Sequence, residues 1–478
     1  MLRWIFGGRE AQSSVEKSGV LCIGEEQPKN CFTELQVLKG HFDIVRFLVQ
    51  IDDFRCASAG DDGLVLVWNV ETGERAQELR GHSRQITAMA VLRCGDVRLI
   101  TASSDRSVSL WDPDTGNRLQ TVLDLQSSVK CILVLDRMSA WISGGQQLCV
   151  WSRDFRLQCL KERRSDTGQP PKHLCGRCHL RWLALAHLGR SSVRLFCLWT
   201  GISLLIQLPE NRVAAAVDKS IVIYKLMASG DALTVMEVRC LADHQDQIRA
   251  LINVDDAAFA SGSHAGELIV WDALDCSMLA YQHILWEEPQ NQAEQSHIQT
   301  GGPKTSEMSI QHLASNGNLV AAAVGSGVYV FNVASKTAAA YRKRAHDSDV
   351  LHISMLSDSE LMSCSEDGSV RMWEIRELPL AGEPASPGFF GMWTLGRSSR
   401  QACPPSKKTS DVAPSKTLEL TGDLIGHSGA VQMFVALPEN GLLTCSADHQ
   451  LILWKNGEKQ SRLRSLELFR KLEEKGGL

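Results

Sequence analysis

One spacing recurs along this chain and limits what it can fold into. A tryptophan follows a histidine 27 residues later at His41–Trp68, His244–Trp271, His346–Trp373 and His427–Trp454, and 29 residues later at His82–Trp111. A serine or threonine lies ten residues before each of these tryptophans, and in four of the five units an aspartate lies six residues before it. Fixed spacings of this kind mark an internal repeat, and they place one polar set in each copy.

Each polar set can form a buried relay. A buried indole N–H, hydroxyl, imidazole and carboxylate all need partners, and together they satisfy one another. Because the sets recur, we predict a structural role, whereas a catalytic triad occurs once in a chain. The fifth unit has Ala265 where the others have aspartate; the four complete tetrads are His41, Ser58, Asp62 and Trp68; His82, Thr101, Asp105 and Trp111; His346, Ser363, Asp367 and Trp373; and His427, Thr444, Asp448 and Trp454.

The clearest repeat, residues 345–374, predicts strands separated by turns. Residues 348–355 are apolar and β-prone, and residues 360–365 form the next strand segment. Glu366-Asp367-Gly368 is a tight turn, after which residues 369–373 alternate between polar and apolar side chains. Three weaker units end at Trp151, Tyr224 and Phe331, which brings the count to eight. The repeat resembles the WD-repeat family, in which each copy is a four-stranded blade of about 40–45 residues. We therefore predict an all-β, eight-bladed WD-repeat β-propeller.

The register of the repeats predicts how the ring closes. Residues 33–38 look like a strand without a blade of their own, and the eighth unit has only three strands. We expect the N-terminal strand to complete the last blade, because this leaves no open sheet edge. The propeller would then span residues 33–455, after an N-terminal extension of residues 1–32.

Residues 169–201 interrupt the repeat, and we interpret them as an insertion. Either an alternative splice form or a gene-model error would explain its origin. The segment has no Asp or Glu, and removing it restores the usual period. Cys175-Gly-Arg-Cys178-His179 matches the c-type haem attachment string, but that chemistry requires an exported protein. A zinc site would need two further ligands at a recognised spacing. We expect neither cofactor nor metal here.

A second break, residues 283–304, is polar and reads as a solvated loop. The third, residues 376–416, has six of the fourteen prolines and predicts a protruding loop. It displays Phe389, Phe390, Met392 and Trp393, side-chain types that are enriched in protein interfaces. We predict that these four residues bind a partner; the alternative is that they fold back onto their own blade.

After the ring, residues 456–478 predict a short amphipathic helix. Leu463, Leu466, Phe469 and Leu472 recur every three residues, and Arg462, Arg464, Arg470 and Lys471 face away from them. A helix of this length is marginal alone in water, so its apolar side needs a partner, which is either another protein or the ring itself. Leu2, Trp4, Ile5 and Phe6 could belong to the same surface.

Composition excludes several classes of function. The 478 residues carry a net charge of −5, which argues against a nucleic-acid partner. Most of the 15 cysteines stand singly in apolar runs, which favours buried thiols in a reducing compartment over a disulfide framework. In and beside the predicted insertion, Arg190 and Arg194 leave residues 195–209 as the longest uncharged run, which is too short to span a membrane. We expect a cytoplasmic protein that is not an enzyme.

The chain also resembles one branch of the WD-repeat family over nearly its whole length. The resemblance includes the opening Met-Leu-Arg-Trp, residues 41–50, 262–275, 363–373 and 388–393, and Leu451-Ile-Leu-Trp-Lys-Asn-Gly457. It implies a scaffold subunit of a complex with two DENN-type proteins, which acts on small GTPases and in autophagy. It further implies recruitment to lysosomes through a cationic amino-acid transporter, with residues 388–393 as the anchor and the terminal segments holding the DENN partner.

The alternative function is a substrate receptor of a cullin-type ubiquitin ligase. Receptors of that kind have an arginine two residues after a Trp-Asp pair. Here Asp114 and Leu274 stand at that position after Trp111-Asp112 and Trp271-Asp272. The docking box is therefore absent, and the scaffold is the function that we predict.

Overall fold

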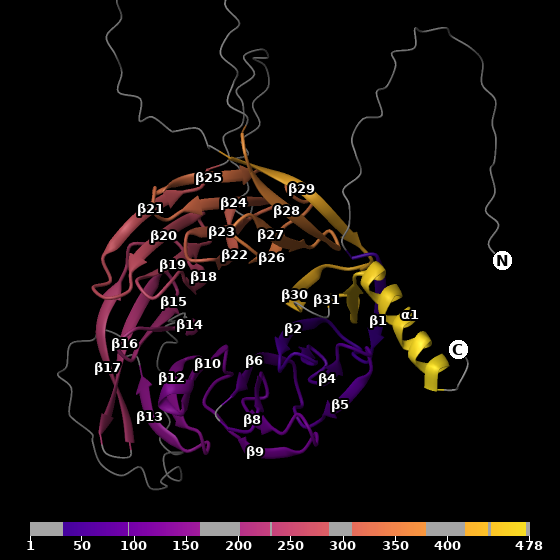
Figure 1. The fold of residues 1–478 in the computed structure, drawn as a ribbon. Coiled ribbons are helices and arrows are strands. Elements are labelled where there is room, and N and C mark those ends of the chain that lie inside the picture. The colour runs from indigo at the N-terminus through magenta and orange to yellow at the C-terminus, as the bar shows by residue number, and fades with distance from the viewer. Residues whose placement is uncertain are drawn as a thin grey trace, which may run out of the picture.

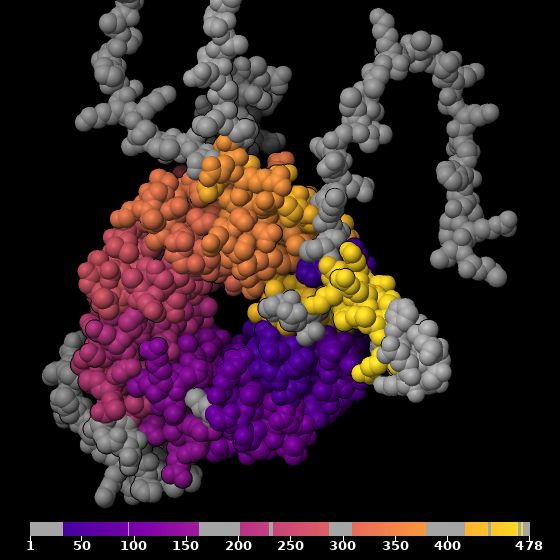
Figure 2. Space-filling model, in the orientation of Figure 1, coloured from indigo at the N-terminus to yellow at the C-terminus, as the bar shows by residue number. Residues whose placement is uncertain are grey.

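The computed structural model describes residues 32–93, 95–162, 201–229, 232–285, 308–378, 416–437 and 441–474. Its strands form eight antiparallel sheets of four strands each. The sheets stand around a common axis as the blades of a ring, and the space-filling view shows that the ring is hollow at its centre (Figures 1 and 2). This confirms the predicted all-β, eight-bladed propeller.

Within a blade the strands follow one another in chain order from the axis outward, except in the last blade. Blades 1 to 4 consist of β2 (Val45–Gln50), β3 (Arg55–Gly60), β4 (Val65–Asn69) and β5 (Arg75–Leu79); β6 (Ile86–Leu92), β7 (Arg98–Ser103), β8 (Val108–Trp111) and β9 (Arg118–Val122); β10 (Cys131–Leu135), β11 (Ala140–Gly144), β12 (Gln147–Ser152) and β13 (Leu157–Glu162); and β14 (Ile202–Leu208), β15 (Arg212–Val217), β16 (Ser220–Ser229) and β17 (Ala232–Leu241).

Blades 5 to 8 complete the circle. They consist of β18 (Ile248–Asn253), β19 (Ala258–Ser263), β20 (Glu267–Asp272) and β21 (Met278–His283); β22 (Ile310–Ser315), β23 (Leu319–Val324), β24 (Gly327–Asn332) and β25 (Thr337–Arg342); β26 (Val350–Met355), β27 (Glu360–Ser365), β28 (Ser369–Glu377) and β29 (Lys416–Ile425); and β30 (Val431–Leu437), β31 (Gly441–Ser446), β32 (Gln450–Lys455) and β1 (Glu34–Lys39).

The middle strands are apolar on both sides because a neighbouring blade covers each face. Strand β23 and, after Arg212, strand β15 are runs of valine, alanine and leucine in which every position is buried. Continuous apolar runs are typical of strands that are covered on both faces. The core is accordingly divided into clusters between adjacent blades, and one of them joins blade 8 to blade 1 through Leu38, Leu48 and Leu453.

The N-terminal strand closes the ring, as predicted. β1 pairs antiparallel with β32, with Glu34 opposite Lys455 and Lys39 opposite Gln450. The order of the eighth sheet is β30-β31-β32-β1, so the blade takes its outer strand from the other end of the chain. Lys455 also donates from Nζ to the carbonyl of Glu71 in blade 1, at 2.6 Å.

The α-helix α1 (Gly457–Glu474) follows β32 directly, which confirms the predicted C-terminal helix. Asn456 caps its start, because Asn456 Oδ1 accepts a hydrogen bond from the amide of Lys459 at 3.0 Å. In Figure 1 the helix lies beside β1 and points away from the ring. Among the described residues, no helix is both long and apolar enough to cross a membrane.

Two of the breaks in the repeat differ in extent from their prediction. Arg376 and Glu377 continue β28, and Lys416 begins β29, because the two strands stay paired as far as Glu377 and Lys416. These three residues were predicted to lie in the protruding loop, and residues 379–415 lie outside the described part of the chain. His283 ends β21, and residues 286–307 are not described.

The predicted insertion, residues 169–201, falls almost entirely in the undescribed stretch 163–200. Blade 4 on its far side has all four strands. The amide of Ile202, where β14 starts, donates to the carbonyl of Gly145 in blade 3 at 2.6 Å. Blade 4 is therefore joined to blade 3 at the first residue after the interruption.

Candidate functional site

The relay of blade 7 shows what the repeated residues do. Trp373 donates from Nε1 to Ser363 Oγ at 2.8 Å, and the same hydroxyl lies 2.7 Å from His346 Nε2. His346 Nδ1 lies 3.1 Å from Asp367 Oδ2. Because a carboxylate only accepts, the proton sits on Nδ1, and Ser363 therefore donates to Nε2. The chain of donors ties together β27, β28 and the loop that precedes β26.

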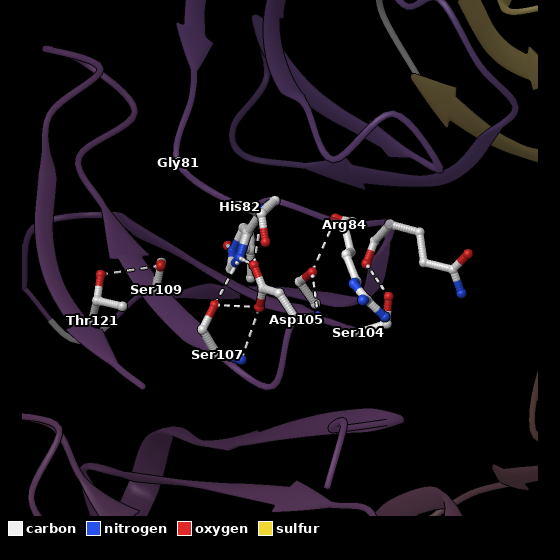
Figure 3. A network of polar contacts seen from close by, with 12 residues as sticks. Gly81, His82, Arg84, Ser104, Asp105, Ser107, Ser109 and Thr121 are labelled. Carbon is white, nitrogen blue, oxygen red and sulfur yellow. Dashed lines mark hydrogen bonds and ion pairs between the residues drawn. The ribbon is translucent and has the colours of Figure 1, made fainter. Parts of the chain in front are cut away.

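The other three complete tetrads have the same contacts. In each, the tryptophan donates to the serine or threonine at 2.8–3.0 Å, and the histidine bridges that hydroxyl to its aspartate. Figure 3 shows this corner in blade 2, where His82 Nδ1 lies 3.2 Å from Asp105 and 2.9 Å from Ser107 Oγ. The aspartate also accepts from a backbone amide of the histidine loop, that of Ser83 at 2.9 Å. The relay thus fixes a loop as well as two strands.

Blade 5 completes its relay with a residue that the spacing did not reveal. Ala265 stands at the aspartate position, but Glu267 Oε2 lies 3.2 Å from His244 Nδ1 and accepts from the amide of Gln245 at 2.9 Å. Ser261 joins His244 to Trp271 at 2.7 and 2.9 Å. Glu267 is buried, and its carboxylate also accepts from Ser263 and Tyr281. Glu267 lies two residues beyond the aspartate position of the repeat. Its extra methylene lets the carboxylate reach the histidine from there.

The weaker units replace the relay with packing. In blade 3, Trp151 donates to Ser143 at 2.9 Å, and its ring stacks on Trp141 with centroids 5.1 Å apart. Tyr224 and Phe331 occupy the tryptophan position in blades 4 and 6 and are buried. These blades keep the aromatic anchor of the repeat without a histidine relay.

Hydrogen bonding determines the charge of the relay carboxylates. Burial alone would raise the pKa of Asp367, but hydrogen bonds from His346, Ser369 and two backbone amides outweigh burial and hold this pKa well below its usual range. The pKa values of Asp62, Asp105, Glu267 and Asp448 are lowered in the same way. Burial lowers the pKa of His82, His244 and His427, so these rings are neutral at pH 7.

Most of the relay of blade 7 is shielded from solvent. The tryptophan, hydroxyl and histidine of blade 7 are all buried. The described residues contain no group of three or more His, Cys, Asp or Glu side chains that could hold a metal ion. Burial also raises the pKa of the Cys56 and Cys131 thiols to about 12, so both stay protonated at neutral pH.

Helix α1 leaves apolar side chains uncovered. Leu463 is 49% exposed and Leu466 is 61% exposed. The helix contacts the ring through Gly457, whose amide donates to Thr33 Oγ1 at 3.1 Å, and through Arg464, which pairs with both oxygens of Glu34 at 3.1 Å. Phe469 and Leu472 lie in the helix, but their side chains are outside the described set, as are Phe389, Phe390, Met392 and Trp393 in their loop.

Eight four-stranded blades, five of them closed by a histidine relay onto an aromatic anchor, define a WD-repeat β-propeller. The crystal structure of the computationally designed Ika8 protein matches this fold with a TM-score of 0.56 and 18% identity over 87% of this chain and 98% of that one. The profile of the WDR41 β-propeller family matches residues 1–171 and 191–464, and the chain belongs to this family.

Two relatives cover the full length of the chain. WD repeat-containing protein 41 of Homo sapiens is 48% identical over 489 residues, which span all of this chain and 99% of the human protein. The protein of the same name from Mus musculus is 46% identical over the same extent. The interval between the two matched stretches, residues 172–190, lies inside the predicted insertion.

Proposed function

We propose that the chain is a non-catalytic adaptor subunit of a cytoplasmic complex with two DENN-type proteins that regulates small GTPases in autophagy. In this proposal α1 holds the DENN partner. Residues 388–393 recruit the complex to the lysosomal surface by docking on a cationic amino-acid transporter. Full-length membership of the WDR41 β-propeller family supports the adaptor role, since WD-repeat propellers typically act as interaction platforms.

The observation that carries the proposal is the exposed apolar side of α1. Fully burying a leucine contributes about 1.5–3 kcal/mol, and Leu463 and Leu466 realise only part of this against the ring. The helix is also held to β1 at Glu34, so it presents these leucines in a fixed direction. A preorganised apolar helix is a common way for one protein to dock on another.

The first experiment replaces Leu463 and Leu466 with glutamate in the full chain and identifies the proteins that co-precipitate. Because both side chains are already half exposed, the ring should fold normally and keep its thermal midpoint. We expect the unchanged chain to recover the DENN-type proteins and the double variant to lose them. The matched control replaces Arg462 and Arg470, two exposed arginines of the same helix, with glutamine.

Two results would contradict the adaptor proposal. One is recovery of DENN-type proteins by the leucine variant at the level of the arginine control. The other is recovery of cullin-ligase subunits by both variants, which would support the substrate-receptor function and leave α1 as a part of the ring.

A second experiment concerns the loop. Alanine at Phe389, Phe390 and Trp393 should abolish enrichment of the chain in the lysosomal fraction while the DENN-type proteins still co-precipitate, because the two surfaces lie on different segments. The thermal midpoint of the variant is the control. A lowered midpoint together with normal lysosomal enrichment would show that these aromatic residues pack on their own blade.

A further inference from the structure

The first described residues of the chain and the start of α1 meet at one place on the ring. Phe32 packs into the core between blades 7 and 8, and Thr33 donates from its amide to the carbonyl of Lys455 at 3.1 Å. Thr33 Oγ1 then accepts from the amide of Gly457, the first residue of α1. A Cβ on residue 457 would lie 2.5 Å from that hydroxyl oxygen, so glycine permits the close approach. The strand that closes the ring and the helix that follows the ring are therefore in direct contact.

About two turns further along α1, an ion pair adds to this contact. The Arg464 guanidinium donates from two nitrogens to the two carboxylate oxygens of Glu34, both at 3.1 Å, across 430 residues of sequence. A bidentate pair of this kind fixes direction as well as distance. Glu34 is the first residue of β1. The ion pair therefore holds the end of β1 at which its separation from β32 would begin.

Beyond its pairing with β32 and the Gln36 contact with blade 1, the strand buries little apolar surface. Its outward side chains Leu35 and Val37 are exposed, and Leu38 is the apolar residue of β1 that is buried. In blades 1 to 6 the outer strand follows its neighbour through a short turn, and in blade 7 it follows after residues 378–415, whereas β1 pairs with β32 across almost the whole chain. β1 is therefore an edge strand joined to one neighbour, and edge strands open at a lower free energy than strands that are paired on both sides.

We propose that α1 and β1 form a latch on the seam of the ring, so that docking of α1 holds β1 in the eighth blade and closes the propeller. The helix is short enough to be marginal without contacts, and the strand is an edge strand joined to one neighbour. Each therefore stabilises the other through Gly457–Thr33 and Arg464–Glu34. Linkage then couples the seam to a partner that binds α1. If closing the seam tightens the binding of that partner, the bound partner favours the closed seam by the same coupling free energy.

The latch is tested in the isolated full chain by hydrogen exchange of the β1 amides, with the amides of β4 as an internal reference. Arg464→Glu replaces attraction to Glu34 with repulsion, and it should speed exchange in β1 about two- to fivefold without changing β4. The combined variant Glu34→Arg with Arg464→Glu restores an opposite pair and should return β1 to its original rate.

Arg462→Glu is the matched control, because it reverses the charge of an exposed arginine on the same helix that makes no ion pair with the described residues. Unchanged β1 exchange in Arg464→Glu would overturn the latch. Equal acceleration in Arg462→Glu, or failure of the swapped pair to restore the rate, would do the same, since either result assigns the effect to the helix alone.

The linkage to a partner rests on the proposed function and has its own readout. With the DENN-type protein bound, β1 exchange should slow further, and Leu463→Glu with Leu466→Glu should remove that slowing. If the charge-swap experiment succeeds and the partner has no effect on β1, the latch stands and its coupling to the partner is wrong. If the partner does not bind at all, the proposed function fails and the charge-swap result is unaffected.

Discussion

At the scale of single residues, the relay tolerates movement of its carboxylate along the chain. Asp62, Asp105, Asp367 and Asp448 reach their histidines from the turn, and Glu267 reaches His244 from the first position of β20. The spacing of the repeat could predict the four aspartates because each sits at the same distance from its tryptophan. It could not predict Glu267, since a longer side chain two residues further along fills the same space.

The relay of blade 7 gives a direct stability prediction. Asp367→Ala leaves the buried Nδ1–H of His346 and the amide of Asp347 without their carboxylate acceptor. We expect the free energy of unfolding to fall by about 1–3 kcal/mol, measured by urea denaturation. The exposed Asp256→Ala is the control and should stay within about 0.5 kcal/mol. An Asp367→Ala protein as stable as this control would exclude a structural role for the tetrad.

At the scale of elements, neighbouring inner strands are joined by rings as well as by aliphatic packing. His312 of β22 and His352 of β26 have ring centroids 4.1 Å apart, and Phe434 of β30 stands 4.8 Å from His352. Periodicity predicted the three repeats to which these strands belong, but a contact between rings from three repeats depends on the angle between blades. That angle is a property of the closed ring and is not visible in any one repeat.

This stack predicts acid sensitivity. Burial lowers the pKa of His312 to about 4, below its ordinary value of 6.5. Burial and the neighbouring His312 also lower the pKa of His352 well below its ordinary value. As the pH falls, the unfolded chain therefore binds these protons before the folded chain does. Stability should be constant above pH 6.5 and decline between about pH 6.5 and 4, by at most about 3 kcal/mol for His312.

Urea denaturation of the unchanged chain and of His312→Leu across this pH range measures the effect. The variant has one proton fewer to bind on unfolding, so its stability should fall less steeply with acid. Parallel pH profiles of the two proteins would show that the decline comes from other groups.

Element boundaries were harder to predict than the presence of elements. The interface composition of residues 376–416 suggested a loop throughout, yet β28 and β29 extend as a paired ribbon to Glu377 and Lys416. Strand pairing there is decided by the partner strand across a long break in the sequence, which local composition does not report. The exposed side of α1 could not be predicted for a similar reason. An amphipathic pattern shows that one face of a helix needs an apolar contact, but it does not identify what provides that contact.

At the scale of the whole molecule, closure of the ring depends on residues 34–39. Deleting everything before Gly40 removes β1, exposes the edge of β32 and takes Leu38 from the core between blades 8 and 1. We expect the free energy of unfolding to fall by at least about 2 kcal/mol, with a lower thermal midpoint for the ring as one unit. Deleting only residues 1–31 retains β1 and is the control, and equal midpoints for the two deletions would contradict closure by β1.

The meeting of Glu34 with Lys455 and Arg464 has a consequence for biosynthesis. β1 leaves the ribosome long before its pairing partner β32 has been translated. At about 5–20 residues per second, it waits on the order of tens of seconds with its apolar Phe32 and Leu38 unprotected. A nascent chain that stops short of β32 can never bury them, so premature termination produces a ring that chaperones and proteases can distinguish from a finished one.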